Sequence, residues 1–313
     1  MRSSSIPDKI LVIVGPTCSG KTAVSLDLAR RLNGEIISAD SRQVYKYLDI
    51  GTAKPAPGDL LKVKHYFVDS LFPDQDFNAG EFGQEGRKII DNILLRGLLP
   101  IVVGGSGLYV RSLIDGFFEG PGADEEFRRA MEQRFKAGHL DSLLKKLREV
   151  DPVSAATIDP TKSRRIIRAL EVYHLTGIPI SQLQKERRIK VRFVPVIFGL
   201  EWTRPMLHKR IDQRCDRMLS QGLLSEVDRL VRQGYDDSLN ALNTVGYAEA
   251  FAYRRGEISY ERFTQLFKQN SRRYAKRQMT WFKRDGRIHW IQMIEEKNVH
   301  EVVQKIATQF CTR

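Results

Sequence analysis

Short runs of consecutive apolar residues alternate along the chain with longer stretches in which apolar residues recur every three or four positions. Apolar runs of about four to eight residues, rich in Val and Ile, are typical of buried strands, and the three-to-four spacing is typical of helices. We predict six strands, at residues 10–14, 35–39, 65–68, 100–103, 194–200 and 288–291. Strands and helices that alternate in this way predict an α/β fold, with a parallel sheet flanked by helices on both faces.

The stretch between the fourth and fifth predicted strands has no strand signal. It is rich in charged residues, and its apolar residues keep a helical spacing. We therefore predict an inserted all-helical domain at residues 115–192, within an α/β core of residues 1–114 and 193–313 whose C-terminal part is helical. The helical pattern of the insert rests on Phe127, Met131, Phe135, Leu140, Leu143, Leu144, Leu147, Ile166, Ile167, Leu170, Val172 and Tyr173.

Composition agrees with a globular protein and adds a strong positive charge. The chain has 313 residues, of which 42% are hydrophobic and 28% charged, enough for one large core and a smaller domain. Lys and Arg number 51 against 38 Asp and Glu, which gives a formal net charge of +13. This balance favours a polyanionic partner, although a basic surface can also serve solubility alone.

Cysteine spacing and the N-terminus exclude several classes of protein. Cys18, Cys215 and Cys311 are far apart and have no C-x-x-C spacing, which argues against a zinc site and against a disulfide framework. The first residues contain no apolar segment of signal-peptide length, and no later run is long enough to cross a membrane. We expect a cytoplasmic protein that has no membrane partner.

The strongest local motif is the segment GPTCSGKT at residues 15–22, a complete G-x-x-x-x-G-K-[ST] phosphate-binding loop. It follows an apolar run and leads into a helical pattern, so it predicts a P-loop NTPase-like core. Backbone N–H groups at the start of that helix would cradle phosphate oxygens, and Lys21 would reach between phosphates. Thr22 would offer its hydroxyl to Mg²⁺ or to a leaving group. The alternative, a chance glycine-rich turn, does not explain the flanking strand and helix.

Two further segments belong to the same edge of the predicted sheet. Asp40 follows the second strand, where its carboxylate could bind Mg²⁺ through water, accept a proton, or merely cap the next helix. The fourth strand ends in glycines and Ser106, where a phosphate-loop ATPase commonly has a metal-placing Asp. Asp69 is a substitute candidate or a turn residue. The edge therefore indicates a phosphate site for something other than nucleotide hydrolysis.

Basic residues cluster at positions 163–168, 185–192 and 272–287. The last cluster also contains Tyr274, Trp281 and Phe282, rings that could stack on bases. A helix with a solvated basic face and a buried aromatic face has the same pattern. Three clusters together with the net charge favour RNA or DNA as the partner.

These motifs in combination resemble the tRNA dimethylallyltransferase family of bacteria. The resemblance runs from about residue 10 to residue 290, and it rests on GPTCSGKT, on ADSRQVYKYLDIGTAKP at 39–55, on GGSGLY at 104–109 and on AKRQMTWFKR at 275–284. It implies transfer of a dimethylallyl group from dimethylallyl diphosphate to N6 of the adenosine at tRNA position 37, next to the anticodon. The expected partners are therefore dimethylallyl diphosphate and the anticodon stem-loop of tRNA, and we expect a monomer.

The resemblance also implies roles for individual residues. Asp40 would be the general base that accepts the N6 proton, and Thr22 and an arginine would stabilise the departing diphosphate. That arginine is expected to be Arg214, with Arg210 as the second choice, and Mg²⁺ is implied with Thr22 as its ligand. The expected diphosphate-binding residues are Gly15, Pro16, Thr17, Cys18, Ser19, Gly20, Lys21 and Thr22.

The resemblance also implies which residues of this chain contact tRNA. The chain has Ser106 where the family usually has Thr, which keeps the hydroxyl, and neutral Asn243 and Thr244 where the family often has other polar or basic residues. The expected tRNA-binding residues are Asp40, Ser41, Arg42, Gln43, Ser106, Arg128, Arg164, Arg165, Ile166, Ile167, Arg168, Asn243, Thr244, Val245, Gly246, Tyr247 and Ala248.

Two other functions are compatible with parts of the sequence. An isopentenyltransferase or kinase that acts on free adenine nucleotides would need the phosphate loop, but it would not need the basic clusters. A nucleic-acid-binding module with a regulatory nucleotide site would need both. Preference for AMP over tRNA would support the first, and coupling between nucleotide and RNA binding would support the second.

Overall fold

The computed structural model of the chain describes residues 8–116, 120–186, 191–294 and 298–312. The chain divides into two compact units, one of Met1–Ile114 and Val191–Arg313 and one of Asp115–Lys190. The inserted domain was predicted to begin at residue 115, as the second unit does, and to end at residue 192 rather than at Lys190. Part of the basic cluster predicted at 185–192, residues 187–190, lies outside the described residues.

The first unit is built on a six-stranded sheet in which every neighbouring pair of strands is parallel. The order of strands is β3-β2-β4-β1-β5-β6, and all six predicted strands are confirmed. The strands are β1 (Lys9–Val14), β2 (Gly34–Ser38), β3 (His65–Tyr66), β4 (Leu99–Gly104), β5 (Val194–Glu201) and β6 (His289–Gln292).

Strand β3 is shorter than the predicted segment 65–68. Phe67 and Asp69 adopt left-handed backbone conformations, with φ of 60° and 51°, which no strand can accommodate. The chain turns there, and β3, which is an edge strand of the sheet, ends at Tyr66.

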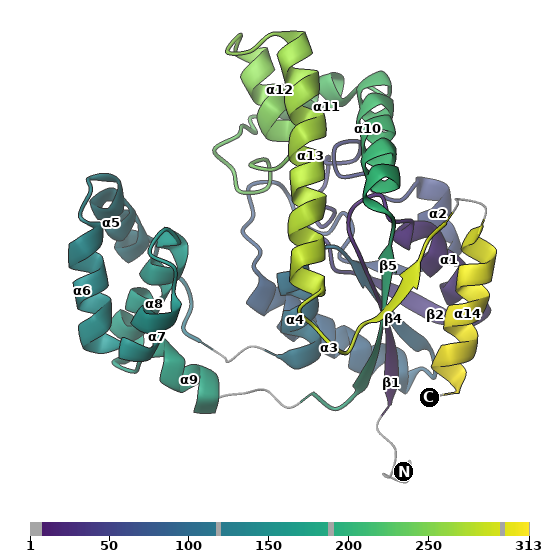
Figure 1. Cartoon of the computed structure of the whole chain (residues 1–313), viewed down its shortest axis with the longest axis horizontal. Coiled ribbons are helices and arrows are strands. Elements are labelled where there is room, and N and C mark those ends of the chain that lie inside the picture. The colour runs from purple at the N-terminus through teal and green to yellow at the C-terminus, as the bar shows by residue number, and fades with distance from the viewer. Residues whose placement is uncertain (1–7, 117–119, 187–190, 295–297, 313) are drawn as a thin grey trace. The chain divides into compact units, whose positions relative to one another are not determined.

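The central strands are buried on both faces, which explains their uninterrupted apolar sequence. Residues 10–14 of β1 are 0% exposed. Helices α1 and α14 lie on one face of the sheet and α3 and α4 on the other (Figure 1). The helices around the sheet are α1 (Lys21–Arg31), α2 (Pro57–Lys62), α3 (Ala79–Leu95), α4 (Gly107–Asp115) and α14 (Val299–Cys311).

Four more helices pack on one another beyond the carboxyl ends of the strands. They are α10 (Arg204–Ser220), α11 (Leu223–Arg232), α12 (Tyr247–Arg254) and α13 (Tyr260–Phe282). Helix α13 runs from this group of four helices to the sheet (Figure 1). Its buried residues include Phe263, Phe267, Gln278 and Phe282. Of the three rings named in the C-terminal basic cluster, Phe282 is buried, whereas Tyr274 and Trp281 are partly exposed. The cluster is therefore helical over residues 272–282, and one of its three rings belongs to the core.

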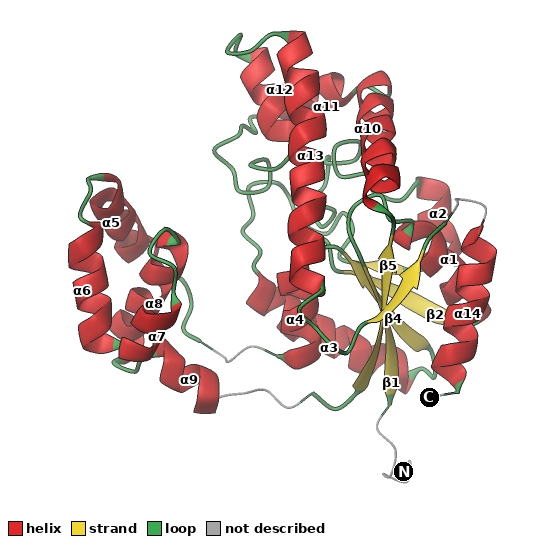
Figure 2. Cartoon of the chain, in the orientation of Figure 1, coloured by secondary structure: helices red, strands yellow, loops and turns green. Residues whose placement is uncertain are grey.

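The described part of the second unit consists of helices and loops (Figure 2). Its core contains Leu143, Leu147, Ile166 and Leu170, which follow the predicted helical spacing. The helices are α5 (Glu125–Lys136), α6 (Leu140–Val150), α7 (Pro152–Thr157), α8 (Ser163–Thr176) and α9 (Ile180–Glu186). None of the helices in the described ranges is both long and apolar enough to span a membrane.

Candidate active site

The phosphate-binding loop connects β1 to α1, as its motif predicted. Gly15 has φ of 146°, and a Cβ there would lie 2.6 Å from the Leu200 carbonyl oxygen, so only glycine fits between the two strands. Gly20 has φ of 93° and precedes the first residue of α1. The loop therefore directs the N-terminus of α1, with its unpaired N–H groups, toward the space at the carboxyl ends of the strands.

A cavity of about 380 Å³ lies at this edge of the sheet. Because parallel strands end at the same edge, the loops after β1, β2 and β4 all reach it. The candidate catalytic residues are brought together here: Thr22, Asp40, Arg210 and Arg214 all line the cavity, as does the expected diphosphate-binding residue Lys21. Other lining residues that the sequence predicted are Thr17, Cys18, Ser19, Gly20, Arg42, Gln43, Thr244 and Val245.

Lys21 is the cation at the base of the loop. Its amino group donates a 2.6 Å hydrogen bond to the Pro16 carbonyl oxygen. Burial, and then the nearby charge of Arg214, lower the pKa of Lys21 from 10.5 to about 8, although the Asp40 carboxylate opposes this shift. The buried Lys21 ammonium group has less negative charge around it than would balance its own charge, so it is suited to bind an anion.

The two candidate arginines differ in how they are held. The Arg210 guanidinium lies 4.3 Å from the centre of the Trp202 ring, and its Nε donates a 2.9 Å hydrogen bond to the Cys18 carbonyl oxygen. Arg214 makes longer contacts, 3.9 Å to Cys18 Sγ and 3.5 Å to the Thr52 carbonyl oxygen. Both arginines line the cavity, but Arg210 is engaged in supporting the loop. Arg214, which has only long contacts and lies near Lys21, is the better placed of the two to bind an anion there.

Asp40 follows β2 by two residues. Its Oδ1 accepts hydrogen bonds from the backbone N–H groups of Arg42, at 2.9 Å, and Gln43, at 3.3 Å. The carboxylate therefore closes a turn and does not cap a helix, which was the alternative we considered, and Asp40 also lines the cavity. Ser106 accepts a 3.1 Å hydrogen bond from the Ser41 N–H, which ties the turn to the end of β4.

Sequence reasoning did not assign Tyr274 and Gln278 to the site, but both line the cavity from α13. Tyr274 has a hydrogen bond with Ser106, and burial followed by the Asp40 charge raises its pKa to about 12. The Gln278 side chain accepts a 2.8 Å hydrogen bond from the Thr17 N–H and donates a 2.9 Å one to the Gly105 carbonyl. Tyr274 was named in the sequence only as a ring of the 272–287 basic cluster, and Gln278 only as part of the AKRQMTWFKR motif at 275–284, so neither was given a role in the site.

The oxygen atoms around the cavity are suited to Mg²⁺ held mainly by a phosphorylated ligand. No group of three or more His, Cys, Asp or Glu side chains converges among the described residues. Thr22 and Asp40 nevertheless offer a hydroxyl and a carboxylate, and Mg²⁺ commonly takes one or two protein oxygens plus phosphate and water. Ser19, also in the lining, has a buried hydroxyl without a partner in the described structure. Asp69 is paired with Lys54, so it serves the turn.

Two of the expected tRNA contacts in the helical unit need correction. Ile166 and Ile167 are 0% and 4% exposed, because α8 turns these side chains into the core of the unit. Arg164 and Arg165 are exposed. Arg128 and Arg168, also expected to contact tRNA, bond the buried Glu171 at 2.8 and 2.6 Å.

The segment 243–248 also differs from the expectation. Tyr247 is 0% exposed and donates its hydroxyl proton to Glu226 at 2.6 Å, so its ring cannot contact RNA. Gly246 is buried as well. Thr244 and Val245 line the cavity and remain candidates.

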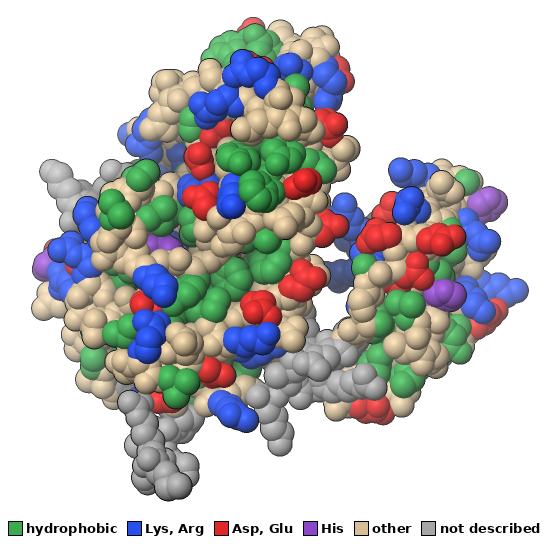
Figure 3. All heavy atoms as spheres, turned by 180° about the vertical axis from the view of Figure 1, so that it is seen from behind, with side chains coloured by type: hydrophobic (Ala, Val, Ile, Leu, Met, Phe, Trp, Pro, Cys, Tyr) green, Lys and Arg blue, Asp and Glu red, His purple; other side chains and the backbone are tan. Residues whose placement is uncertain are grey.

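Charge is distributed rather than concentrated. Lys and Arg side chains are spread over the face shown in Figure 3, with Asp and Glu side chains among them. Two cations of α13, Lys268 and Arg272, pair with the α10 acids Asp216, at 2.6 Å, and Asp212, at 2.5 Å. Lys283, which follows α13, pairs with Glu201 at 2.6 Å. Along α13 the exposed basic residues are Arg262, Arg273, Lys276 and Arg277.

The chain is similar to known proteins over nearly its whole length. A protein family described as IPP transferase matches residues 43–285. A protein named tRNA dimethylallyltransferase from Acetivibrio thermocellus is 43% identical over 307 residues, which are 97% of this chain and 98% of that protein. One with the same name from Pelotomaculum thermopropionicum is 41% identical over 98% of each chain.

Solved structures agree with these sequence relatives. The crystal structure of a tRNA isopentenylpyrophosphate transferase from Bacillus halodurans has 38% identity and a TM-score of 0.70, with 96% of each chain covered. A structure of a eukaryotic dimethylallyltransferase acting on tRNA has 26% identity and a TM-score of 0.82, and the match covers 97% of this chain and 80% of that one.

Proposed function

Because the chain belongs to the tRNA dimethylallyltransferase family, we propose that it transfers the dimethylallyl group of dimethylallyl diphosphate to N6 of the adenosine at tRNA position 37. The product would be N6-(dimethylallyl)adenosine next to the anticodon. The relatives are named for tRNA, which favours this function over transfer to free adenine nucleotides.

One observation carries the proposal. Lys21, Arg214 and Asp40, two cations and one carboxylate, line a single cavity beside a phosphate-binding loop. The cations and the helix N-terminus suit a diphosphate, and the carboxylate suits a proton that is lost on the opposite side of the reacting carbon. A nucleotide hydrolase would instead need a residue that positions water for attack.

The proposed reaction is a substitution at C1 of the dimethylallyl group. The N6 lone pair forms a bond to C1 of the dimethylallyl group as the bond between C1 and the diphosphate oxygen breaks. The diphosphate leaves with the electron pair, and Lys21, Arg214 and the loop N–H groups neutralise its charge. Asp40 accepts the N6 proton. An exocyclic amine conjugated to its ring is a weak nucleophile, so alignment with the allylic carbon carries much of the activation.

Mg²⁺ is proposed as the cofactor, with Thr22 as its protein ligand. When bound, it would add positive charge to the leaving diphosphate. The residues of the chain would do the rest: they hold the diphosphate, orient the acceptor and remove the proton.

The proposed tRNA acceptor has consequences for how the adenine binds and for where the protein acts. To reach the cavity, the adenine must leave the stack of the anticodon loop, as bases do in enzymes that modify them. We infer a monomer, because the groups proposed to bind the donor and accept the proton belong to one chain. We also infer a cytoplasmic location, where the tRNA acceptor is found.

The test is incubation of the protein with labelled dimethylallyl diphosphate, Mg²⁺ and unmodified tRNA, followed by mapping of the labelled nucleoside. We expect the label on adenosine 37 and no transfer when guanosine replaces that adenosine. AMP in place of tRNA should accept little label. Label outside the anticodon loop, or preference for AMP, would contradict the proposal.

A further inference from the structure

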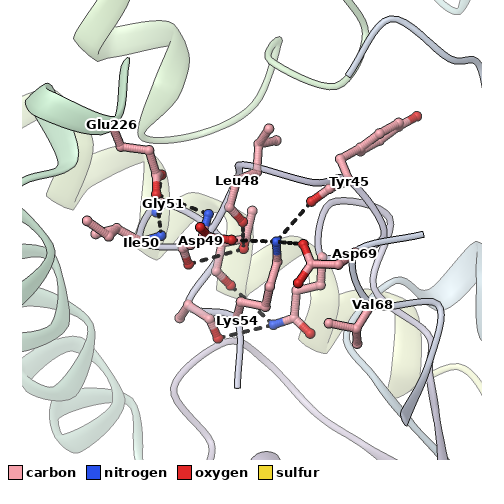
Figure 4. Close-up of polar contacts among 12 residues, drawn as sticks. Tyr45, Leu48, Asp49, Ile50, Gly51, Lys54, Val68, Asp69 and Glu226 are labelled. Carbon is pink, nitrogen blue, oxygen red and sulfur yellow. Dashed lines mark hydrogen bonds and ion pairs between the residues drawn. The ribbon is translucent and has the colours of Figure 1, made fainter. Parts of the chain in front are cut away.

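A buried carboxylate holds one wall of the cavity by its backbone. Glu226 of α11 is 1% exposed, and its oxygens accept hydrogen bonds from the N–H groups of Asp49 at 3.1 Å, Ile50 at 2.7 Å and Gly51 at 3.1 Å. The Tyr247 hydroxyl donates a fourth, at 2.6 Å. Figure 4 shows Glu226 directed at this backbone. We call residues 49–53 the 49–53 loop.

Three consecutive backbone donors that converge on one carboxylate leave the 49–53 loop little freedom, because moving any of them would leave a buried charge poorly compensated. Packing adds to this restraint. A Cβ at Gly51 would lie 2.5 Å from ring atoms of Tyr247, so the loop and α12 are in contact without spare room.

A lysine holds the same loop from its other side. The Lys54 side chain is 5% exposed, and its amino group lies 2.6 Å from Asp49 Oδ1 and 3.0 Å from the Tyr45 carbonyl oxygen. It also pairs with Asp69. Figure 4 shows the amino group directed between these three partners. Glu226 therefore holds residues 49–51 of the 49–53 loop, and Lys54, the residue that follows the loop, pairs with its first residue, Asp49.

Gly51, Thr52 and Ala53 of the loop line the cavity, and the carbonyls of the last two accept hydrogen bonds from side chains that also line it. The Thr52 carbonyl oxygen accepts from Gln43 Nε2 at 3.2 Å and from the Arg214 guanidinium at 3.5 Å. The Ala53 carbonyl oxygen accepts from the same Gln43 amide at 3.2 Å. Gln43 in turn donates its N–H to Asp40. The loop thus links the proposed diphosphate-binding arginine to the turn of the proposed general base.

We propose that Glu226 is a positioning residue for diphosphate binding: through the 49–53 loop it places the Thr52 carbonyl, which orients the Arg214 guanidinium toward the diphosphate. This rests on the proposed function of the cavity. Glu226 is not among the residues that line the cavity, whereas Arg214 is, so the effect of Glu226 on the diphosphate passes through Arg214.

The first test is Glu226→Gln. Each carboxylate oxygen accepts two of the four hydrogen bonds, so either orientation of the amide directs an NH₂ group at one or two backbone donors. We expect about a tenfold weaker Kd for inorganic diphosphate with Mg²⁺, measured by calorimetry, which corresponds to about 1.4 kcal/mol.

A double-mutant cycle shows whether the effect passes through Arg214. Binding to Arg214→Ala is expected to be weak, so we would measure it by equilibrium dialysis with labelled diphosphate. If Glu226 acts through the guanidinium, Glu226→Gln combined with Arg214→Ala should bind diphosphate as Arg214→Ala does. A general loss of structure would instead weaken binding by a similar factor in both backgrounds.

Lys54→Met is the second variant, in case Glu226→Gln does not fold. Its partners Asp49 and Asp69 are about half-exposed, so they can be hydrated when the lysine is lost. We expect the same loss of diphosphate affinity and the same absence of effect with Arg214→Ala. The matched control is Asp151→Asn, a buried carboxylate of the helical unit that also accepts backbone N–H bonds, from Ser154 and Ser181. It should leave diphosphate binding unchanged.

The outcomes separate this proposal from the proposed function. If the wild-type chain neither binds diphosphate nor transfers dimethylallyl, the proposed function fails. If the wild type is active while the folded variants bind diphosphate normally, or lose affinity equally with and without Arg214, the positioning role of Glu226 is overturned.

Discussion

The side-chain oxygen of Gln278 accepts a 2.8 Å hydrogen bond from the backbone N–H of Thr17, so a helix near the C-terminus holds the phosphate-binding loop near the N-terminus. The same side chain donates to the Gly105 carbonyl at the end of β4. A Cβ at Gly105 would lie 2.2 Å from the Gln278 amide nitrogen, so the fit is close.

Gln278→Leu should lower the free energy of unfolding by about 2–6 kcal/mol, because it leaves the Thr17 N–H and the Gly105 carbonyl without partners at about 1–3 kcal/mol each. Urea denaturation followed by circular dichroism measures the change. The matched control is Gln265→Leu, an exposed glutamine of the same helix, which should change stability by less than about 0.5 kcal/mol. Equal effects of the two variants would show that the bridge does not stabilise the loop.

Asp40→Asn should lower kcat about 10²- to 10⁴-fold while tRNA binding is largely kept. The amide oxygen can still accept from the Arg42 and Gln43 N–H groups, so the turn should persist, but an amide cannot take the N6 proton. Single-turnover transfer and filter binding measure the two properties. Asp59→Asn, a substitution at an acid of α2 paired with Lys62, is the control and should behave as wild type. Near-normal turnover of Asp40→Asn would remove Asp40 as the base.

The affinity for diphosphate should fall as the pH rises above about 8, because the pKa of Lys21 is lowered to about 8. The anion prefers the ammonium form, so binding above this pH must take up a proton, and each further pH unit weakens binding by up to about tenfold. Calorimetry in buffers of different ionisation enthalpy measures the uptake. Lys21→Arg should bind more weakly but lose this pH dependence, because its guanidinium stays charged. A constant affinity of the wild type from pH 7.5 to 9.5 would contradict the prediction.

Glu171→Gln should destabilise the helical unit by about 1–3 kcal/mol, because it removes the negative charge to which Arg128 and Arg168 bond. Burial alone would raise the pKa of Glu171, but hydrogen bonds from Arg168, the Asp124 backbone and Arg128 outweigh burial and lower it. A lowered pKa means that this stabilisation is present above the ordinary glutamate pKa of about 4.3 and is lost as the pH falls below it.

Hydrogen exchange of α5 and α8 measures this effect. Protection should decrease between about pH 5 and 3 in the wild type and should be lower, with a weaker pH dependence, in Glu171→Gln. Glu132→Gln, an exposed acid of α5, is the control. A pH dependence that persists unchanged in Glu171→Gln would assign it to another group.

Much of the first unit could be predicted because its signals are local. A buried parallel strand needs a continuous apolar run, and the phosphate loop needs glycines at fixed positions. Both features can therefore be recognised from a short stretch of consecutive residues. The end of β3 was missed because Phe67, an aromatic residue of a type common in strands, adopts a left-handed conformation that its residue type does not signal. Asp69, which we had considered as a turn residue, is left-handed as well.

The site contacts that were missed depend on side chains far apart in the sequence. Glu226 has the pattern of an ordinary helix residue, and its partners at 49–51 are more than 170 positions away. The expectation that Tyr247 and Ile166 contact tRNA came from resemblance, which assigns a position but not the direction of its side chain. Both side chains are turned inward.

The bridge from Gln278 to Thr17 joins residues 261 positions apart, and the bonds from Trp202 and Arg210 to the same loop span 183 and 192 positions. A chain that emerges from the ribosome N-terminus first therefore makes its phosphate-binding loop early, but it lacks the last partner of that loop until residue 278 has been synthesised. Contacts of such sequence separation also form slowly in folding. The binding cavity is consequently completed near the end of synthesis, and until then the nascent chain has a phosphate-loop motif without its full set of supporting contacts.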